Sequence, residues 1–382
     1  MNVLVIEGMN PSAPAIGGSK AYSINLIEFL SKIGIGITLL GFCRGNKTLL
    51  KNKFTFVSVA NKTSMSGYEF LFRLFIKIPL LNIPVSTIIH AQRPEYILPF
   101  VFFHRKNPRM VTLHGRILEG IIFKRSKIVS LIYKTVEYYA LKHSHVIIAV
   151  DEGTKEFYQR QYPKLVTKIQ VIPIGIDLSK FRLLNREALR HKLGFKSDDK
   201  VVAYVGRLVK EKNIDFLLKS FTLLLEAISE ALLIIIGEGS DRERLERLVR
   251  SLNLKNVIFM GAQESNKIPE ILNCADVLAL CSLYEGSPTV VKEALACGVP
   301  VVSTNVGDVS NIIKNETIGQ ITSENVARFS HALIVWLRKE DRENVRKECA
   351  NTAAKFSFEN IATRTVALYN ELLTEKRIKE RN

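Results

Sequence analysis

The sequence lacks several features that define common classes of protein. Only five of its 382 residues are cysteine, and they form no CxxC pair and have no histidine at zinc-site spacing. Scattered thiols of this kind favour a cytoplasmic protein with reduced cysteines. No apolar run reaches the roughly 18 residues that a membrane-spanning helix needs. The first residues, MNVLVIEGMN, carry no basic segment before the apolar one, so we expect no signal peptide.

Signatures of several nucleotide-binding and nucleic-acid-binding proteins are also missing. The sequence contains no G-x-x-x-x-G-K-[ST] loop, helix-turn-helix pattern, zinc finger or RNP motif. Asp198 and Asp199 are adjacent and do not form the D-x-D pair of metal-dependent transferases. Arg242 stands where a G-x-G-x-x-G motif would have its third glycine, which weakens a dinucleotide oxidoreductase interpretation. We therefore expect no metal site, no separate cofactor and no nucleic-acid partner.

Positive charge is concentrated in the first half of the chain, whose formal net charge is +17. Residues 1–175 carry 23 Lys and Arg against 9 Asp and Glu, a balance of +14. Residues 176–382 carry 31 against 28, a balance of only +3. A basic half is typical of proteins that meet an anionic partner such as a phospholipid, a lipid phosphate or a nucleic acid, although a solubility bias produces the same pattern.

Short β-branched runs alternate with longer amphipathic stretches along most of the chain. Runs typical of buried strands occupy residues 2–8, 36–42, 54–60, 87–92, 110–115, 145–150 and 169–175. Further runs of this type occupy residues 200–208, 231–239, 256–262, 276–282 and 300–305. Strands that alternate with helical patterns predict an α/β fold with parallel sheets built from βαβ units.

A connector with Pro, Gly and Asp interrupts this alternation near residue 173. We therefore predict two Rossmann-like, doubly wound domains, residues 1–173 and 174–382. The final stretch, 357–382, is helical and charged, and it could pack back on the first domain. Because such folds bind ligands at the carboxyl ends of their strands, functional residues should follow directly after the predicted strands.

The most specific pattern is LYEGSPTVVKEALACGVPVVSTNVG at residues 283–307. Ser287 and Pro288 are suited to the N-cap and the first position of a helix, whose free N–H groups would favour a diphosphate. Thr289 and Glu293 are four residues apart and would lie on the same helix face. A carboxylate at Glu293 could accept both hydroxyls of a ribose, and Glu285 in the loop could bind sugar hydroxyls. Without the rest of the pattern, Glu285 and Glu293 could also be ordinary solvated charges on a surface helix.

A second group of candidate residues follows VVAYV, residues 201–205, which is the strand-forming part of the run at 200–208. Arg207 and Lys212 lie in the next loop, where a guanidinium and an ammonium could neutralise the charges of a diphosphate. At ~4 Å and an effective dielectric constant near 20, each contact supplies about 4 kcal/mol of Coulomb attraction before desolvation. An ordinary basic surface loop would have the same composition.

Glycines and one histidine follow other predicted strands. Gly17 and Gly18 precede the first helical pattern, and glycines there allow the backbone to approach a phosphate or a sugar. Gly237 and Gly239 follow the strand at 231–236, and Gly261 ends the next one. His114 comes at the end of the predicted strand MVTLHG, a position that favours function over a purely structural role.

Glu285 and Glu293, with seven residues between them and ALACGVPVV following, resemble the E-x7-E motif of glycosyltransferase family 4. The resemblance covers the whole chain and is closest in its second half. It implies the GT-B fold, in which two Rossmann-like domains face each other across a cleft. It also implies retention of anomeric configuration without a metal ion.

The family resemblance assigns roles to the matching residues of this chain. It places Glu285 on the donor sugar, Glu293 on the ribose, and Arg207 with Lys212 on the donor phosphates. It places the loop with Gly237 and Gly239 beside the nucleotide, and Gly261 near the base, which the backbone would read. The donor base, UDP or GDP, therefore stays open. His114 would contact the transferred sugar, and Gly17 with Gly18 the donor phosphate and the acceptor.

These observations predict a retaining, metal-independent hexosyltransferase that uses a nucleotide sugar. The E-G-S-P variant of the motif is most similar to enzymes that build surface polysaccharides or lipid-linked oligosaccharides, so we expect a lipid-linked or glycan acceptor. A nucleotide-sugar 2-epimerase of the same fold and a non-catalytic basic protein that binds membranes or nucleic acids are the alternatives.

Two stretches could bring such an enzyme to the inner face of the cell membrane. Residues 67–81 and 117–134 mix bulky apolar residues with basic ones. Lys124, Arg125 and Lys127 interrupt the second stretch, which favours a peripheral contact with anionic lipid. For residues 67–81, we instead expect the apolar side chains to belong to the core.

Overall fold

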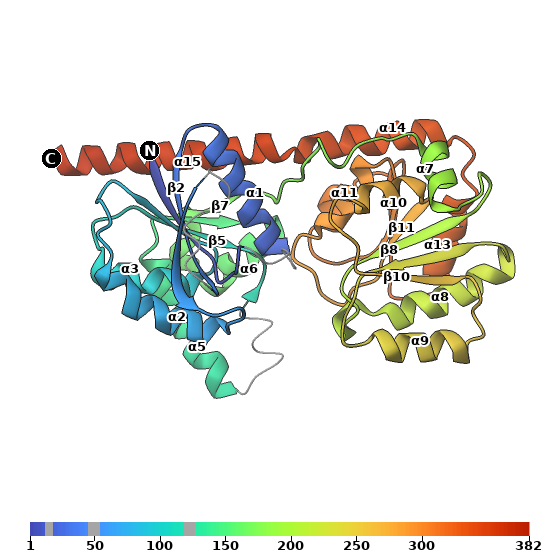
Figure 1. Cartoon of the computed structure of the whole chain (residues 1–382), viewed down its shortest axis with the longest axis horizontal. Coiled ribbons are helices and arrows are strands. Elements are labelled where there is room, and N and C mark those ends of the chain that lie inside the picture. The colour runs from blue at the N-terminus through green and yellow to red at the C-terminus, as the bar shows by residue number, and fades with distance from the viewer. Residues whose placement is uncertain (12–17, 45–53, 118–126, 382) are drawn as a thin grey trace. The chain divides into compact units, whose positions relative to one another are not determined.

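The computed structural model describes residues 1–11, 18–44, 54–117 and 127–381. Its contacts divide the chain into two compact units (Figure 1). The first unit contains residues 1–175 and 358–382, and the second contains residues 176–357. Lys124, Arg125 and Gly17, which the sequence singled out, lie outside the described residues.

The first unit is built on a parallel sheet. Its described strands, in spatial order, are β3 (Thr55–Asn61), β2 (Gly36–Cys43), β1 (Asn2–Ile6), β4 (Ile88–Ala91), β5 (Arg109–Leu113), β6 (Val146–Ala149) and β7 (Ile169–Val171). The described helices are α1 (Gly18–Lys32), α2 (Gly67–Lys77), η1 (Ile78–Leu80), η2 (Pro94–Ile97), α3 (Leu98–Phe103), α5 (Lys127–Lys142), α6 (Glu152–Gln161), η3 (Pro163–Lys168) and α15 (Phe358–Arg381).

Alternate residues of the first sheet face two separate cores. Val3 and Val5 of β1 pack with helices α1 and α15 on one face. Leu4 and Ile6 pack with α2, α3 and α6 on the other. This period of two explains why β1 reads as a continuous apolar run, since both of its faces are covered.

The second unit repeats this design with a smaller sheet. Its described strands, in spatial order, are β10 (Val257–Gly261), β9 (Leu232–Ile236), β8 (Val201–Val205), β11 (Val277–Leu280), β12 (Val301–Thr304) and β13 (Gly319–Thr322), all parallel. The described helices are α7 (Arg186–Leu193), η4 (Lys210–Lys212), α8 (Ile214–Ala227), α9 (Arg242–Ser251), α10 (Ile268–Cys274), α11 (Thr289–Ala296), α12 (Val309–Ile312), α13 (Val326–Leu337), α14 (Arg342–Ala353) and η5 (Ala354–Phe356). Strand β13 has only four residues, and the sequence pattern did not reveal it.

In both units the sheet order reverses beside the first strand. The neighbours of β1 are β2 and β4, and the neighbours of β8 are β9 and β11. Loops that leave the carboxyl ends of adjacent strands diverge at such a point and form a site for a ligand. The strand ends that carry the candidate residues therefore meet at one edge of each sheet.

A buried chain of hydrogen bonds ties the last helix to the first unit. His90 of β4 contacts the Tyr369 hydroxyl of α15 through Nδ1 at 2.6 Å and Thr112 Oγ1 of β5 through Nε2 at 2.7 Å. All three side chains are fully buried, and burial lowers the pKa of His90 to about 3. The ring is therefore neutral and supplies one donor and one acceptor to its two partners.

We expect Tyr369→Phe to destabilise the first unit by about 1–3 kcal/mol, because it leaves a buried His90 nitrogen without a hydrogen-bond partner. Urea denaturation of the full chain measures the loss. Tyr68→Phe is the matched control, since Tyr68 is 60% exposed and loses the same hydroxyl. Equal effects of the two substitutions would contradict the proposed role of this hydrogen bond.

Candidate active site

The structure brings together charged residues that are far apart in the sequence. Lys212, at the end of η4, forms an ion pair with Glu285, in the loop after β11. Ser282 donates a second hydrogen bond to the same Glu285 oxygen at 2.7 Å. Strands β8 and β11 are neighbours, so their loops leave the same edge of the sheet. The predicted phosphate-binding and sugar-binding residues therefore share one small area of the second unit.

Backbone contacts hold these two loops together. The Leu283 N–H donates to the Glu211 carbonyl at 2.9 Å, and the Cys281 thiol donates to the Lys212 carbonyl at 3.2 Å. Arg207 lies four residues from Glu211 in the same loop, and its side chain is exposed. The ion pair thus sits on a rigid base, with the guanidinium free to reach an anion from solvent.

Helix α11 begins one residue later than the sequence suggested. Pro288 occupies the N-cap position, and no side chain caps the helix. The prediction of Ser287 as N-cap and Pro288 as first helical residue is therefore wrong. The Ser287 hydroxyl instead donates to Asp308 at 2.7 Å and accepts from buried Lys292 at 2.8 Å. The buried Lys292 ammonium requires polar partners. The Ser287 hydroxyl is one of them, so it bonds to Lys292 and Asp308 and not to an N–H group of α11.

Glu293 lies one turn along α11 from Thr289, as the sequence predicted. Thr289 forms a hydrogen bond with its carboxylate, and Lys180 and Lys292 are the nearby positive charges. Burial raises the pKa of Glu293 to about 7, although these three groups act in the opposite direction. The side chain can therefore change protonation state near neutral pH.

Sequence reasoning missed Lys180, which belongs to the connector between the predicted domains. Its ammonium donates to the Ser265 hydroxyl in the segment after β10 and interacts with Glu293. Burial lowers its pKa. The only sequence signal was a single lysine in a loop, so its position beside α11 could come from the tertiary structure alone.

The glycines of the second unit have a clear packing role. Gly237 has φ = +137°, and a Cβ atom there would lie 1.9 Å from the Gly206 carbonyl oxygen. A Cβ at Gly239 would lie 2.1 Å from the Leu208 carbonyl oxygen. Gly261 has φ = +69°, and its carbonyl accepts from the Gly237 N–H at 2.8 Å. The loops after β8, β9 and β10 can pack together only because these positions lack side chains.

The first unit places His114 directly after β5. Its Nε2 lies 2.8 Å from Gln92 Oε1, and Gln92 follows the neighbouring strand β4. Burial lowers the pKa of His114 to about 3, so its ring is neutral. Among the described residues, neither His114 Nδ1 nor Gln92 Nε2 has a hydrogen-bond partner. Two buried polar atoms at adjacent strand ends are therefore available to a ligand.

The structure describes only some of the remaining candidate residues at the carboxyl ends of the first sheet. Gly18 is the first residue of α1, and Gly17 precedes the described part of that helix. Glu7 follows β1, and its pKa is raised to about 7 by burial. Glu7 and Gln92 were not among the predicted site residues, because both fall inside the apolar runs at 2–8 and 87–92. The structure ends these strands at Ile6 and Ala91, which places both polar side chains directly after them.

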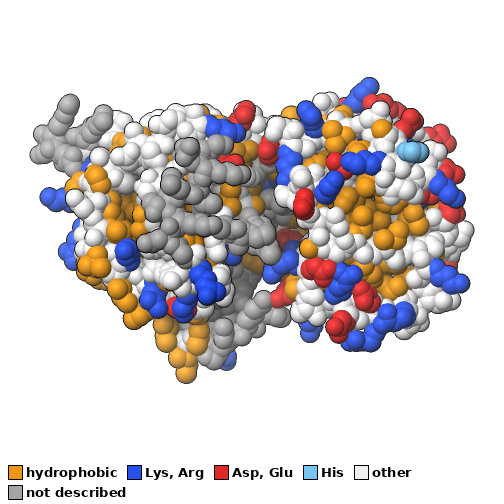
Figure 2. Space-filling view, viewed as in Figure 1, with side chains coloured by type: hydrophobic (Ala, Val, Ile, Leu, Met, Phe, Trp, Pro, Cys, Tyr) orange, Lys and Arg blue, Asp and Glu red, His pale blue; other side chains and the backbone are white. Residues whose placement is uncertain are grey.

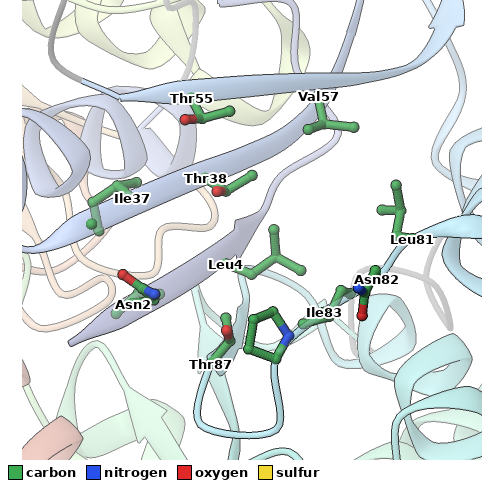
Figure 3. Close-up of a pocket in the computed structure, with 13 residues that line it drawn as sticks. Asn2, Leu4, Ile37, Thr38, Thr55, Val57, Leu81, Asn82, Ile83 and Thr87 are labelled. Atoms are coloured by element: carbon green, nitrogen blue, oxygen red, sulfur yellow. The ribbon is translucent and has the colours of Figure 1, made fainter.

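A hollow lies at the opposite edge of the first sheet, where the amino ends of its strands are (Figure 3). It has a volume of about 340 Å³, and Asn2, Thr38 and Thr55 lie at the amino ends of the strands that line it. Ligands of open α/β sheets bind at carboxyl ends, so this hollow is separate from the candidate site. In the described part of the chain, no group of three or more His, Cys, Asp or Glu side chains is suited to hold a metal ion.

Several solved structures match almost the whole chain. A sucrose-phosphate synthase from Thermosynechococcus elongatus superposes with a TM-score of 0.82 at 19% identity, covering 98% of this chain and 99% of that one. HepE from Anabaena in complex with UDP-glucose gives a TM-score of 0.74 at 17% identity, covering 97% and 100%. At these identities the likeness concerns the fold, which is that of the GT-B glycosyltransferases.

Sequence comparisons then define the family. Residues 16–180 match "Glycosyltransferase Family 4", and residues 185–356 match "Glycosyl transferases group 1". The chain belongs to the glycosyltransferases that these two models describe, one model for each half of the chain. It is 31% identical over 247 residues to an Escherichia coli UDP-Gal:alpha-D-GlcNAc-diphosphoundecaprenol alpha-1,3-galactosyltransferase, over 63% of this chain and 62% of that relative. An uncharacterised glycosyltransferase of Methanocaldococcus jannaschii is 28% identical over 310 residues, 77% of each chain.

The contact between Gln92 and His114 leads to a test in the free protein. We expect Gln92→Glu to raise the pKa of His114 by more than one unit, because a carboxylate at 2.8 Å favours the charged imidazolium. NMR titration of the His114 ring measures the change. Gln170→Glu, on an exposed residue of the same unit, should leave that pKa unchanged. An unaltered His114 titration in Gln92→Glu would show that the two side chains are not coupled.

Proposed function

We propose that this protein transfers a sugar from a nucleotide diphosphate sugar to an acceptor, with retention of anomeric configuration. The observation that carries the proposal is the cluster at the carboxyl edge of the second sheet. There, Lys212 and Glu285 are paired beside the uncapped α11, which also carries Glu293. Cationic, anionic and helix N-terminal groups are the three kinds of partner that a diphosphate, a sugar and a ribose require.

In this proposal the second unit binds the donor. Arg207, Lys212 and the N-terminus of α11 bind the diphosphate, and the loop with Gly237 and Gly239 lies beside the nucleotide. Glu285 accepts hydrogen bonds from the donor sugar, and Glu293 accepts them from the ribose hydroxyls. Gly261 leaves the base in contact with backbone atoms, which suits either UDP or GDP. The structural neighbour HepE is in complex with UDP-glucose, which supports a uridine donor.

The proposed reaction breaks the bond between the anomeric carbon and the diphosphate oxygen. Negative charge grows on the leaving diphosphate, and Arg207 and Lys212 stabilise it electrostatically. The acceptor hydroxyl attacks on the face that the leaving group vacates, and its proton passes to the departing phosphate oxygen. This course needs neither a metal ion nor a strong protein base. The role proposed for His114 of the first unit, whose ring is neutral, is a hydrogen bond to a sugar hydroxyl.

We further propose that the acceptor is a lipid-linked or cell-surface glycan precursor, bound by the first unit where Gly18 begins α1. The name of the E. coli relative describes a diphosphoundecaprenol-linked acceptor and a galactosyl donor, which supports a hexosyltransferase on a lipid-linked substrate. A Bacillus subtilis relative, 34% identical over 173 residues, is named as a putative teichuronic acid biosynthesis glycosyltransferase. A lipid-linked acceptor would place the enzyme at the inner face of the cell membrane.

The activity can be tested with the purified full chain. Thermal-shift measurements with UDP- and GDP-sugars identify the donor, and mass spectrometry of lipid products after incubation with that donor detects transfer. A product heavier by one sugar supports the proposal. An isomerised donor without any transfer would favour a 2-epimerase, and the absence of any response to nucleotide sugars would favour a non-catalytic role.

The raised pKa of Glu293 predicts a pH-dependent donor affinity. An ionised carboxylate accepts hydrogen bonds more strongly than the acid, so affinity should rise between about pH 6 and pH 8 as Glu293 loses its proton. Glu293→Gln should remove this dependence and weaken binding about tenfold at the upper end of that range. Calorimetry across the range measures both effects. Glu343→Gln, on an exposed side chain, is the control, and an unchanged pH profile in Glu293→Gln would contradict the ribose contact.

The leaving-group role predicts a kinetic effect. Arg207→Ala and Lys212→Ala should each lower kcat at least about tenfold, and more than they raise the donor KM, because the charge that they stabilise grows in the transition state. Lys210→Ala, two residues away and exposed, is the matched control. A change in KM alone would assign the residue to binding. Loss of activity in EDTA that magnesium restores would overturn the metal-free mechanism.

A further inference from the structure

Helix α2 carries bulky apolar side chains on two sides. Phe70 and Leu74 are buried in the core of the first unit. Tyr68, Phe72 and Ile76, spaced four residues apart, are exposed by 60%, 63% and 52%. The expectation that the apolar residues of 67–81 belong to the core is thus wrong for this side of the helix. Packing in the core explains the apolar side of α2 that carries Phe70 and Leu74, but not the side that carries Tyr68, Phe72 and Ile76.

Helix α5 exposes several large apolar side chains and buries a carboxylate. Its buried side includes Tyr133 and Glu137, whereas Ile128, Leu131 and Ile132 are exposed by 72%, 65% and 60%. Glu137 is fully buried and accepts hydrogen bonds from two tyrosine hydroxyls, at 2.8 and 2.9 Å. Burial raises its pKa to about 7. A helix whose outer side faced only water would normally turn its isoleucines and leucines toward the core.

Aromatic contacts join α2, α3 and α5 into one surface. The ring of Phe75 in α2 lies 6.1 Å from that of Phe102 in α3, which lies 6.2 Å from that of Tyr139 in α5. Figure 2 shows hydrophobic side chains gathered along this part of the first unit, with Lys and Arg among them. The α2–α5 face is defined here by Tyr68, Phe72, Ile76, Phe102, Leu131 and Ile132.

Basic residues accompany the exposed apolar side chains of the α2–α5 face. Those on or beside its three helices include Arg73, Lys77, Arg105, Lys106, Lys127, Lys134 and Lys142. Glu69 is the acidic residue on α2, and it is paired with Lys62 and Arg73. Exposed apolar side chains interspersed with cations are complementary to a bilayer with anionic headgroups.

We propose that the α2–α5 face docks on an anionic lipid bilayer and inserts its apolar side chains at the boundary of headgroups and acyl chains. The charge complementarity favours this occupant over a second copy of the chain, which would bring the same cations into opposition. No described helix has the length and apolar character needed to cross a bilayer. Lys127 is the member of the predicted basic cluster that belongs to this face, since Lys124 and Arg125 lie outside the described residues.

This face is linked to the candidate acceptor edge within the first unit. The Tyr133 hydroxyl of α5 donates to Glu95 at 3.1 Å, and Glu95 pairs with Arg93 at 2.7 Å. Arg93 follows Gln92, the residue that contacts His114 after β4. Docking would therefore hold a lipid-linked substrate near the ends of β4 and β5. This last point rests on the proposed function, whereas docking itself does not.

Vesicle co-sedimentation of the full chain tests the proposal, with phosphatidylcholine alone and with added phosphatidylglycerol. We expect binding to rise with the anionic fraction and to fall with salt. Lys127→Ser/Lys134→Ser/Lys142→Ser should weaken binding to anionic vesicles about 100-fold, since each cation near the surface adds about 1 kcal/mol. Leu131→Ser/Ile132→Ser should weaken it at least about tenfold through lost insertion.

Matched controls come from exposed residues of the second unit. Ile258→Ser/Val335→Ser removes apolar side chains of 43% and 44% exposure, and Lys339→Ser/Lys347→Ser removes exposed cations. Neither should alter vesicle binding, and unchanged urea denaturation would show that the α5 variants are folded. Equal binding to neutral and anionic vesicles, or binding that the α5 variants retain, overturns the proposal. So does a dimer in sedimentation velocity that Leu131→Ser/Ile132→Ser dissociates.

The two proposals can fail separately. Vesicle binding is measured without a nucleotide sugar, so a protein that docks but transfers no sugar retains the docking proposal and loses the proposed function. A protein that transfers sugar to a water-soluble acceptor but binds no vesicles retains the proposed function and loses the docking proposal. If both hold, the α5 variants should lose activity on a lipid-linked acceptor in vesicles and keep it on a soluble analogue.

Discussion

The arrangement of this protein depends on the covering of both faces of each parallel sheet. Side chains of the strands are committed to two cores, as Val5 and Ile6 show by packing on opposite faces of β1. Polar groups that must meet a ligand can therefore emerge only where strands end. His114, Gln92 and Glu285 all follow strands directly or within a few residues. The same constraint makes the strands readable in the sequence and gathers the candidate residues at one edge of each sheet.

Ion pairing then organises that edge in the second unit. Lys212 and Glu285 come from different loops, and the pairing of β8 with β11 brings them together. Buried Lys292 takes the Ser287 hydroxyl, which leaves α11 without a side-chain cap. The glycines at 237 and 239 let the neighbouring loops approach each other by backbone contact. The start of α11, the Lys212 cation and the Glu285 carboxylate are thus held at the carboxyl end of one sheet by contacts between its loops.

Buried polar groups have a comparable effect in the first unit. His90 joins α15 to the sheet through Tyr369, so a segment from the end of the chain completes the unit that its beginning forms. Glu137 and its tyrosine partners occupy the inner side of α5, and the isoleucines of that helix remain outside. On α5 the exposed apolar side chains therefore lie over a buried polar cluster, whereas on α2 they lie over the apolar core residues Phe70 and Leu74.

The α/β class, the strands up to β12 and the family were all readable from the sequence, because apolar runs and the E-x7-E spacing are local patterns. The place of Glu293 beside Thr289 was readable for the same reason, since helical periodicity is local. Strand β13 was not, because four residues acquire strand character only by pairing with β12. Lys180, the cap of α11 and the exposed side of α2 were decided by the tertiary structure alone. These three features depend on contacts between residues that are far apart in the sequence. The pattern of neighbouring residues contains no information about such contacts.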